Sequence, residues 1–476
     1  MGTAGRESSC AWFARKGREL SSNSRRSKYM LALAIAASTG YDNGSPHSRL
    51  PPLGWSSWVA LGPGAEHPIF DFCDEASVMK SIDAFHDIGL YSMGYRHFHL
   101  DDCWAGGRNS TGFLYPEPDR FPNGLKKVID YAHNKNLTFG VYTCAGTKTC
   151  VGGRPGSKGY WTQDANVFAE WGVDWVKMDC TVTRIERPSS HRPFALINPY
   201  LIMLPPGCNT EGMHPKEAYA KMSAAMNATG RHMHLNMCEW GKENPWEWGD
   251  HIAQSWRMSG DHTGVWSSTK QQIRESAAIP ANYTGRPFGW NDMDMLETGN
   301  YKQAAHANHR ESNMTSIEYH TEFSMWAISA SPLVVTTPIM NCTAAQSKAD
   351  GGAPVTCRGW ISELQRSILL NSEVLAINQD VTPQGRPVKE QDLRVWARHL
   401  SDGSVAIALY NEQDVAQRIT VAFTDLGWDA STRASIRDLW AKADEGTFVG
   451  KYPIDGGASV APHATRLLRL TRSTLA

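Results

Sequence analysis

The sequence predicts a (β/α)8 barrel followed by a C-terminal antiparallel β-sandwich domain. Between about residues 51 and 382, short apolar runs alternate with amphipathic segments, as expected for parallel strands joined by helices. Eight such runs can be distinguished, and a closed barrel of this kind has eight strands. From residue 383 to 476 the pattern changes to short alternating runs separated by turn residues, which indicates antiparallel strands.

The predicted barrel strands are short, apolar and bounded by glycine, proline or polar residues. Such runs are typical of strands that are buried on both faces. No glycine-rich dinucleotide-binding loop follows the first strand, which argues against an open doubly wound sheet. The predicted strands are Leu53–Ser57, Tyr95–Asp101, Leu137–Thr143, Val173–Asp179, His232–Cys238, Gln254–Met258, Pro287–Asp292 and Pro332–Thr337.

Helical periodicity is found in six segments between these strands. They are Asp74–Ile88, Gly124–Lys135, Gln163–Trp171, Lys216–Ala228, Lys270–Asn282 and Ser312–Ala327. The C-terminal domain is expected to contain no catalytic constellation. Its predicted strands are Leu393–Leu400, Ser404–Asn411, Gln417–Phe423, Arg433–Asp438 and Arg466–Leu470.

The first 50 residues resemble a secretory leader rather than part of the fold. A basic flank ending at Lys28 precedes the short apolar run Tyr29–Ala37 and a group of small residues. This run is too short to span a membrane. We therefore predict secretion, with the mature protein outside the cell or in a lysosome or vacuole. The net charge of −1 and the lack of basic runs in the folded part argue against nucleic acid as a partner.

Glycosylation sequons and cysteines support the secretory prediction. Nine cysteines follow the leader, and we consider three disulfides: Cys73 with Cys103, Cys150 with Cys180, and Cys342 with Cys357. Cys144, Cys208 and Cys238 remain unassigned. The sequons begin at Asn109, Asn136, Asn227, Asn282, Asn313 and Asn341.

Polar residues gather where the predicted strands end. Lys177 and Asp179 lie two positions apart on one strand and share a face, so a buried ion pair is the simplest interpretation. The pattern recurs on neighbouring strands, however, and active sites of such barrels lie at the carboxyl ends of the strands. The other residues expected on this rim are Trp58, Asp101, Asp102, Tyr142, Glu239, Arg257, Asp261, Asp292 and Asp294.

This residue set suits a hydroxyl-rich ligand. Carboxylates accept hydrogen bonds from sugar hydroxyls, Lys and Arg donate them, and aromatic rings pack on the sugar. Hydrolysis of a glycosidic bond requires two carboxyl groups across that bond. The alternative is a metal-dependent hydrolase, because His97–His99 and His232–His234 are H-x-H pairs on predicted strands. Both pairs precede the strand ends, so we prefer hydrogen-bonded core histidines and expect neither a metal nor a cofactor.

Nine motifs, spaced in order along the chain, together resemble glycoside hydrolase family 27, which contains α-galactosidases and α-N-acetylgalactosaminidases. The resemblance covers about Leu53 to the C-terminus. It implies a catalytic barrel with a C-terminal β domain, as predicted above. The motifs are LGWSSW (Leu53–Trp58), HLDDCW (His99–Trp104), RFPNGL (Arg120–Leu125), GVYTCAGTKTC (Gly140–Cys150), WGVDWVKMDC (Trp171–Cys180), CEWG (Cys238–Gly241), SWRMSGD (Ser255–Asp261), GWNDMDML (Gly289–Leu296) and LAINQD (Leu375–Asp380).

The resemblance implies that Asp179 is the nucleophile and Asp261 the general acid/base of a double displacement that retains the α configuration. Lys177 beside Asp179 is expected to favour the anionic form of this nucleophile. The remaining implied roles concern substrate binding. Three residues would hold the 3-, 4- and 6-hydroxyls: Asp101, Asp102 and Lys177. The walls would be Trp58 and Tyr142, and the groups near the 2-position and the ring would be Arg257, Glu239 and Asp294. The pocket would be completed by Trp240 and Cys150.

The sugar specificity is expected to depend on Glu239 in the CEWG motif. By resemblance, α-galactosidases have a carboxylate here, which accepts from a 2-hydroxyl, whereas their N-acetylgalactosaminidase relatives have a small residue that leaves room for an acetamide. We therefore expect an α-galactosidase. The alternatives are α-N-acetylgalactosaminidase, β-L-arabinopyranosidase, or an inactive galactose-binding protein.

Three features depart from the family pattern. Cys180 directly follows the nucleophile, where the family usually has its cysteine one position later, so a disulfide to Cys150 would need an altered loop. Cys144 could compete with Cys150 for a disulfide to Cys180. The proline-rich insertion at 184–215 follows the strand that carries Lys177 and Asp179, where it would overhang the leaving-group side of the site.

Overall fold

The computed structural model describes residues 40–58, 73–150, 153–179, 210–300, 312–342, 357–453 and 457–473. Residues 184–209 of the predicted insertion, Cys180 and Cys208 therefore lie outside the described residues. Of the predicted leader, only residues 40–50 are described, and they pack on the barrel. Ser48 is fully buried, its Oγ lies 2.9 Å from His234 Nδ1, and the Asn43 side chain donates to the Met233 carbonyl at 2.7 Å.

Eight parallel strands form the barrel, in the hydrogen-bonded order β10-β1-β2-β5-β6-β7-β8-β9. Leu296, just after β9, closes the ring by donating to Val334 O at 2.9 Å and accepting from Thr336 N at 3.1 Å. The predicted barrel is thus confirmed. The strands are β1 (Leu53–Ser56), β2 (His97–Leu100), β5 (Thr138–Cys144), β6 (Trp175–Asp179), β7 (His234–Cys238), β8 (Ser255–Arg257), β9 (Trp290–Asp292) and β10 (Leu333–Val335).

Each observed strand overlaps its predicted range, but β7 and β9 begin later than the apolar runs do. Before β9, Arg286 N donates to Gly289 O at 2.8 Å and Phe288 has φ of 64°, so these residues form a turn. Before β7, His232 is exposed and its ring bonds to the Asn43 carbonyl. Local turn geometry therefore shortens both strands.

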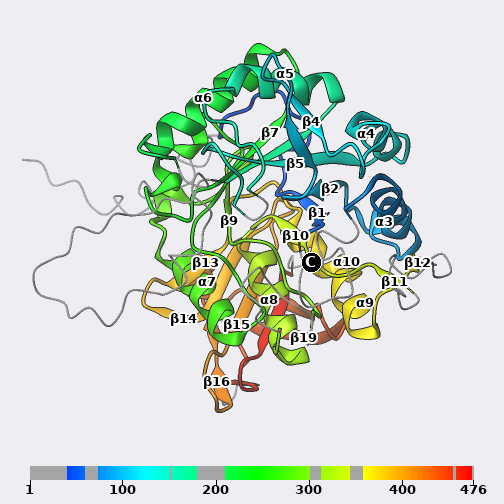
Figure 1. Ribbon diagram of the computed structural model, residues 1–476. Helices are drawn as coiled ribbons and strands as arrows, with labels where there is room; N and C mark the ends of the chain where they lie inside the picture. Colours follow the sequence, from blue (N-terminus) through cyan, green and yellow to red (C-terminus); the bar gives the residue numbers. More distant parts are fainter. Residues whose placement is uncertain are drawn as a thin grey trace, which may run out of the picture. The chain divides into compact units, whose positions relative to one another are not determined.

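Six helices surround the barrel strands, as Figure 1 shows for α3 to α6. They match the six predicted segments. Two short helices, α9 and α10, were not predicted; each begins with a side-chain cap, from Ser362 and Asn371 respectively. The helices are α3 (Glu75–Asp87), α4 (Leu125–Asn134), α5 (Trp161–Trp171), α6 (Pro215–Ala228), α7 (Trp266–Ala278), α8 (Ser316–Ile328), α9 (Glu363–Leu369) and α10 (Ser372–Asn378).

Smaller elements lie in the connections. One disulfide joins Cys73 to Cys103, as predicted. Cys342 and Cys357 face each other in backbone register on two paired strands, while their side chains lie outside the described set. These elements are β3 (Ala105–Arg108), β4 (Leu114–Pro116), β11 (Met340–Cys342), β12 (Cys357–Gly359) and the 3-10 helices η2 (Tyr91–Met93), η5 (Pro245–Glu247), η6 (Gly249–His251), η7 (Ala281–Tyr283) and η9 (Phe423–Leu426).

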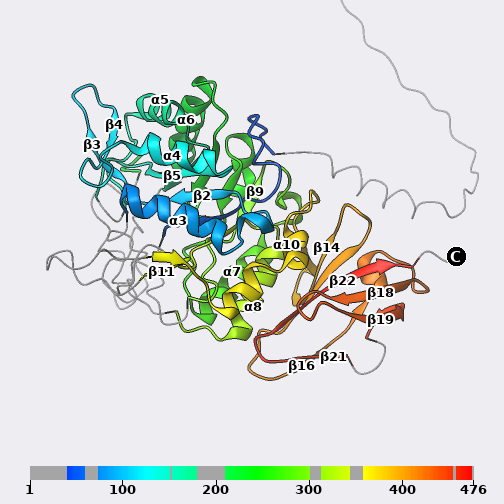
Figure 2. The ribbon, with the colours of Figure 1, turned by 90° about the vertical axis from the view of Figure 1, so that its right-hand side faces the viewer.

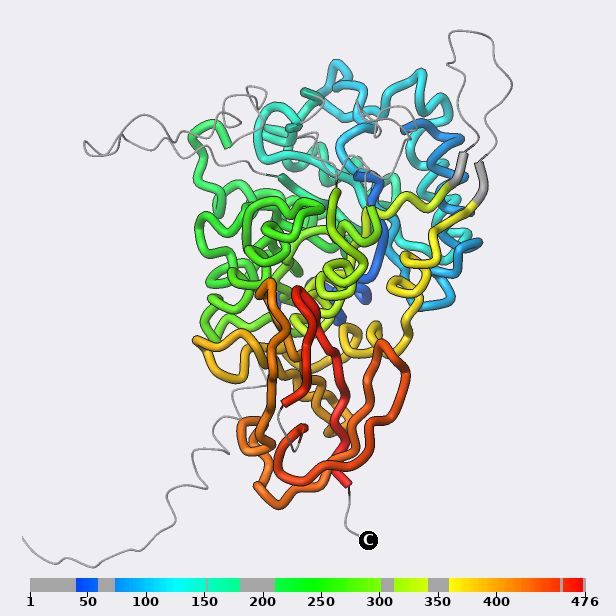
Figure 3. The backbone as a smooth tube through the Cα atoms, turned by 90° about the horizontal axis from the view of Figure 1, so that it is seen from below, coloured from blue at the N-terminus to red at the C-terminus, as the bar shows by residue number. Residues whose placement is uncertain are grey.

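The C-terminal domain contains a six-stranded antiparallel sheet in the order β13-β14-β15-β22-β18-β19, several strands of which lie side by side in Figure 2. Two further strand pairs, β16 with β21 and β17 with β20, lie along the same part of the chain, orange to red in Figure 3. The strands are β13 (Arg386–Lys389), β14 (Asp392–His399), β15 (Val405–Tyr410), β16 (Gln417–Ile419), β17 (Val421–Ala422), β18 (Arg433–Asp438), β19 (Ala443–Val449), β20 (Lys451–Tyr452), β21 (Ala458–Val460) and β22 (Thr465–Arg472).

Apolar side chains from this sheet and from the smaller pairs form one core, which includes Ile407, Phe423, Ile436 and Leu468. All five predicted strands are observed, although the run Gln417–Phe423 is divided between β16, β17 and the start of η9. The sequence did not predict β13, β19, β20 or β21. Most of β19 is exposed, so its sequence lacks the apolar alternation on which such predictions depend.

Helix α8 contacts both the barrel and the β domain. Its residue Thr321 donates to His463 O at 2.6 Å, and its residue Ser324 accepts from Trp440 Nε1 at 2.8 Å. Glu318, in the first turn of α8, lies 2.7 Å from His463 Nδ1. Within the part of the chain that the structure describes, every helix is too short or too polar to be a membrane span.

Candidate active site

The two-residue period of the barrel strands separates an inner from an outer set of side chains. On β6, Val176 and Met178 are fully buried in the apolar core outside the strands. Trp175 and Lys177 instead line a small space inside the barrel. Asp179 follows on the same inner face, at the carboxyl end of β6. The predicted position of the nucleophile at the barrel rim is therefore observed.

Asp179 is held by a hydrogen bond from the barrel wall. Tyr142 on β5 donates its hydroxyl to Asp179 Oδ2 at 2.9 Å. Burial, together with the negative charge of Asp261, raises the pKa of Asp179 to about 6, while Lys177, Tyr142 and Arg257 act in the opposite direction. Lys177 favours the anionic form of Asp179, as expected, but burial has the larger effect, so the net pKa is raised.

Lys177 forms its short ion pair with Asp101 and not with its strand neighbour. Lys177 Nζ lies 2.8 Å from Asp101 Oδ2, and both side chains are buried or nearly so. Burial alone would raise the pKa of Asp101, but Lys177 and His99 hold it well below its usual range. Lys177 Nζ also lies 5.6 Å from the ring centre of Trp58 and 5.3 Å from that of Tyr142.

Arg257 joins two further rim carboxyls. Its Nη1 lies 2.8 Å from Asp294 Oδ1 and its Nη2 lies 3.1 Å from Asp261 Oδ1. The Arg257 side chain is 3% exposed, whereas Asp261 is 28% exposed, so Asp261 can reach solvent. Asp294 has φ of 82°, a left-handed conformation that non-glycine residues rarely adopt and that is concentrated at functional sites.

Asp102 completes the acidic side of this site. It is 2% exposed, and its backbone N–H donates to Asp101 Oδ1 at 2.8 Å. Burial raises the pKa of Tyr142 most, and the charges of Asp179 and Asp102 raise it further. Electrostatic interactions and contacts thus bring nine predicted site residues together. They are Trp58, Asp101, Asp102, Tyr142, Lys177, Asp179, Arg257, Asp261 and Asp294.

Glu239 is held by a contact within its own loop. It is fully buried, and its Oε1 accepts from Glu243 N. Burial raises the pKa of Glu239 to about 8, and the other groups that act on it, Glu243 and Lys242, belong to the same loop. Burial therefore favours the protonated form of this expected carboxylate. Its Oε2 is buried without a hydrogen-bond partner among the described residues.

The two other predicted pocket residues are also not placed with the group. Trp240 has a left-handed backbone, with φ of 63°, in the Glu239 loop. Cys150 is disulfide-bonded, and its partner is not among the described side chains. Cys144 carries a buried thiol whose Sγ lies 3.5 Å from Gly146 N.

A polar floor beneath the rim was not predicted. The Asn236 side chain on β7 donates to Asp292 Oδ2 at 2.9 Å and to Ser255 Oγ at 2.8 Å. Together with His99, Trp175, Lys177 and Arg257, Asn236 and Asp292 line a cavity of about 20 Å³, enough for one water molecule. The two-residue period of the strand could have predicted that Asn236 points inward, because Cys238, Asn236 and His234 share the inner face.

The four histidines of the H-x-H pairs differ from one another. His97 Nδ1 lies 2.6 Å from Thr138 Oγ1, and His234 lies 2.9 Å from Ser48 Oγ and 2.7 Å from Ser255 Oγ. His99 Nε2 lies 3.4 Å from Asp101 Oδ2. These three are buried, as predicted, whereas the prediction is wrong for His232, which precedes β7 and is exposed.

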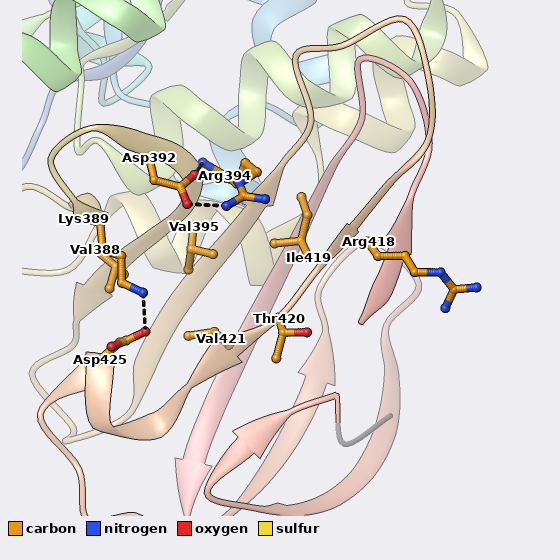
Figure 4. A pocket seen from close by; sticks show the side chains of 10 residues that line it. All are labelled: Val388, Lys389, Asp392, Arg394, Val395, Arg418, Ile419, Thr420, Val421 and Asp425. Atoms are coloured by element: carbon orange, nitrogen blue, oxygen red, sulfur yellow. Dashed lines mark hydrogen bonds and ion pairs between the residues drawn. The ribbon is translucent and has the colours of Figure 1, made fainter. Parts of the chain in front are cut away.

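A larger cavity of about 270 Å³ lies in the β domain (Figure 4). Four of its charged side chains form two ion pairs: Lys389 Nζ lies 3.3 Å from Asp425 Oδ2, and Arg394 Nη2 lies 2.6 Å from Asp392 Oδ2. This arrangement differs from the rim of the barrel, where Arg257 pairs with two carboxyls at once.

Comparisons with known proteins agree with this fold. The family model described as alpha galactosidase A matches residues 50–194 and 192–350, and the α-galactosidase C-terminal β-sandwich domain matches residues 390–470. The α-galactosidase of Cyamopsis tetragonoloba is 35% identical over 428 residues, which are 89% of this chain and 86% of the relative. The α-galactosidase of Oryza sativa subsp. japonica is 34% identical over 434 residues, 90% of this chain and 86% of the relative. The chain belongs to glycoside hydrolase family 27, the α-galactosidase family.

Solved structures place the family 27 fold on the whole described chain. The crystal structure of α-galactosidase I from Mortierella vinacea is similar with a TM-score of 0.70 and 26% identity, covering 90% of this chain and 99% of that one. The Saccharomyces cerevisiae α-galactosidase, solved with raffinose, gives a TM-score of 0.69 at 25% identity, covering 92% and 100%. A β-L-arabinopyranosidase from Geobacillus stearothermophilus, at 20% identity and a TM-score of 0.68 over 90% of this chain and 98% of that one, shares the fold.

The Tyr142 hydrogen bond gives a testable pH dependence. A nucleophilic carboxyl must be ionised, so kcat/KM should fall as the pH drops below about 6. Tyr142→Phe removes a hydrogen bond that lowers the pKa of Asp179 and should move this acidic limb to higher pH by about one unit. Tyr131→Phe is the matched control, because Tyr131 donates to Asp83 outside the site. A limb that stays in place or moves to lower pH in Tyr142→Phe would contradict this account.

Proposed function

We propose that this family 27 glycoside hydrolase removes terminal α-D-galactosyl residues by double displacement, with Asp179 as nucleophile and Asp261 as general acid/base. The observation that carries the proposal is that both carboxyls act on one electrostatic site. Arg257 lies 3.1 Å from Asp261, and the charges of Arg257 and Asp261 both act on the pKa of Asp179. Asp261 is 28% exposed, which suits an acid/base that must exchange a proton with solvent.

In the first step, Asp179 would attack the anomeric carbon while Asp261 gives its proton to the glycosidic oxygen. A bond forms between the carbon and the Asp179 carboxylate, and the carbon–oxygen bond to the leaving group breaks. In the second step, Asp261 would take a proton from water, which attacks the same carbon and releases Asp179. Tyr142 supports both steps because its hydrogen bond orients the attacking carboxylate.

Recognition of the galactosyl ring would depend on the buried pair Lys177–Asp101 and on Asp102. These groups are fixed before substrate arrives, because Lys177 and Asp101 already lie 2.8 Å apart. Preorganised charged groups can exchange hydrogen bonds with ring hydroxyls at little cost in conformational entropy. The aromatic rings of Trp58 and Tyr142, both near Lys177 Nζ, would form the walls of the pocket.

The preference for galactose over N-acetylgalactosamine would depend on the volume of Glu239. This side chain is fully buried, and we infer that it takes up space that a 2-acetamido group would need. Its unpartnered Oε2 would gain a partner from a 2-hydroxyl. The curated relatives at 34–35% identity are α-galactosidases, which supports the same preference.

The test compares 4-nitrophenyl α-galactoside with its 2-acetamido analogue. The wild type should favour the galactoside in kcat/KM by about a hundredfold or more, equivalent to about 2.7 kcal/mol. Glu239→Ser should raise kcat/KM for the acetamido substrate by at least about tenfold, because it opens the enclosed space. Glu247→Ser, an exposed glutamate in η5 just beyond this loop, is the matched control. Comparable wild-type rates on both sugars, or no gain in Glu239→Ser, would reject Glu239 as the selective residue.

We infer that the protein enters the secretory pathway, as a glycoprotein destined for the cell exterior or a lysosome or vacuole. The apolar segment near the N-terminus and the Cys73–Cys103 disulfide support this inference, since disulfides persist in oxidising compartments. Five sequon asparagines have exposed side chains. They are Asn109, Asn136, Asn227, Asn282 and Asn313.

Mass spectrometry of the protein from its native source should find N-glycans on some of these five sites. Thiol labelling under denaturing conditions should leave Cys73 and Cys103 unlabelled until a reductant is added. Unglycosylated protein in which every cysteine is labelled without reductant would instead place the chain in a reducing compartment.

A further inference from the structure

His262 directly follows the proposed acid/base, but its side chain points into the protein. Asp261 is 28% exposed, whereas the side chain of His262 is fully buried. His262 Nε2 lies 2.9 Å from Glu322 Oε1, and the Glu322 side chain is also fully buried. The His262 ring centre lies 5.0 Å from that of Trp326. Two successive residues of one loop thus face opposite environments.

Glu322, on α8, is fixed by two other donors. Its Oε1 accepts from Glu297 N at 2.8 Å and its Oε2 accepts from Thr298 Oγ1 at 2.9 Å. A carboxylate with these contacts can only accept from His262, so the imidazole carries its proton on Nε2. Because the Glu322 carboxylate is held in place, its hydrogen bond fixes the position of the His262 ring.

The other ring nitrogen of His262 is held as well. His262 Nδ1 lies 3.2 Å from Ser268 Oγ, which accepts from Thr263 N at 3.0 Å. The Ser268 hydroxyl hydrogen is then left to donate to His262 Nδ1. Helices α7 and α8 thus fix the imidazole from both sides, through Ser268 and Glu322 respectively.

The backbone of His262 connects this anchor to the catalytic side of the loop. Its N–H donates to Asp294 Oδ2 at 2.7 Å, while Asp294 Oδ1 lies 2.8 Å from Arg257 Nη1. The same guanidinium lies 3.1 Å from Asp261 Oδ1. Asp261, Arg257, Asp294 and the His262 backbone therefore form a closed ring of contacts. The position of the Asp261 carboxyl depends on where the His262 backbone is held.

We propose that His262, locked by Glu322, is the positioning residue for the general acid/base Asp261. This inference rests on the proposed function, in which Asp261 protonates the leaving group. When the acid is misplaced, kcat/KM falls more for a substrate whose leaving group is more basic. A purely structural role would instead lower the active fraction and reduce all rates by one common factor.

The test is a ratio of two kcat/KM values. One substrate is 4-nitrophenyl α-galactoside, whose leaving phenolate needs little protonation, and the other is methyl α-galactoside, whose leaving oxygen must be protonated. In His262→Leu the ratio of the first value to the second should rise by about tenfold or more. His262→Gln, whose amide N–H can still donate to Glu322, should restore most of the wild-type ratio.

Glu318→Leu is the matched control, because Glu318 is a buried glutamate one turn earlier on α8 that contacts His463 instead of the acid/base loop. It should lower stability and leave the ratio unchanged. If His262→Leu does not fold, Ser268→Ala removes the contact to Nδ1 and the bond from Thr263 N, keeps the contact to Glu322, and should raise the ratio by a smaller factor. An unchanged ratio in the folded variant, or an equal rise in Glu318→Leu, would overturn the proposal.

Asp261→Ala separates this proposal from the proposed function. It should shift the same ratio by about 10² or more if Asp261 is the acid. A flat ratio in Asp261→Ala would reject the assignment of the acid itself. A shift in Asp261→Ala together with a flat ratio in His262→Leu would reject only the positioning role.

Discussion

Charge balance at the buried rim of the barrel determines the state of every group in the proposed site. Several carboxyls converge there on two cations, Lys177 and Arg257, in surroundings where an uncompensated charge is costly. Lys177 forms its short ion pair with Asp101, and Arg257 forms its pairs with Asp261 and Asp294. Asp179 has Tyr142 as its short hydrogen-bond donor, so burial raises its pKa to about 6. The pKa of the proposed nucleophile is therefore set by burial against the opposing effects of Lys177, Tyr142 and Arg257.

The interior of the barrel below this rim is polar, whereas many barrels of this class are filled by branched apolar side chains. His234, Ser255, Asn236 and Asp292 form a chain of hydrogen bonds across the three neighbouring strands β7, β8 and β9. Such a network fixes side-chain orientation only when its members are satisfied. Its contribution to function is rigidity, because it supports Lys177 and Arg257 from below.

Much of this architecture could be predicted from the sequence because it follows from local periodicity. Eight short apolar runs gave the barrel strands, and the two-residue period gave the inward positions of Lys177 and Asp179. The net pKa of Asp179 could not be predicted, because burial depends on the whole fold. The orientation of Glu239 follows from one backbone contact within its own loop, to Glu243 N, which no pattern in the sequence reveals. The contact of His262 with Glu322 joins residues 60 positions apart, the first on a loop and the second on α8. Most residues of α8 are buried, so its sequence does not show which side faces this loop.

The central claim is that Asp179 forms the bond to the sugar, and covalent trapping tests it most directly. A 2-deoxy-2-fluoro-α-galactosyl donor with an activated leaving group should inactivate the enzyme, since the fluorine slows release of the glycosyl-enzyme. Peptide mapping by mass spectrometry should place one adduct on the peptide that contains Asp179. Asp179→Asn should fold, lose turnover by orders of magnitude and form no adduct. An adduct on another residue, or full activity in Asp179→Asn, would contradict the account.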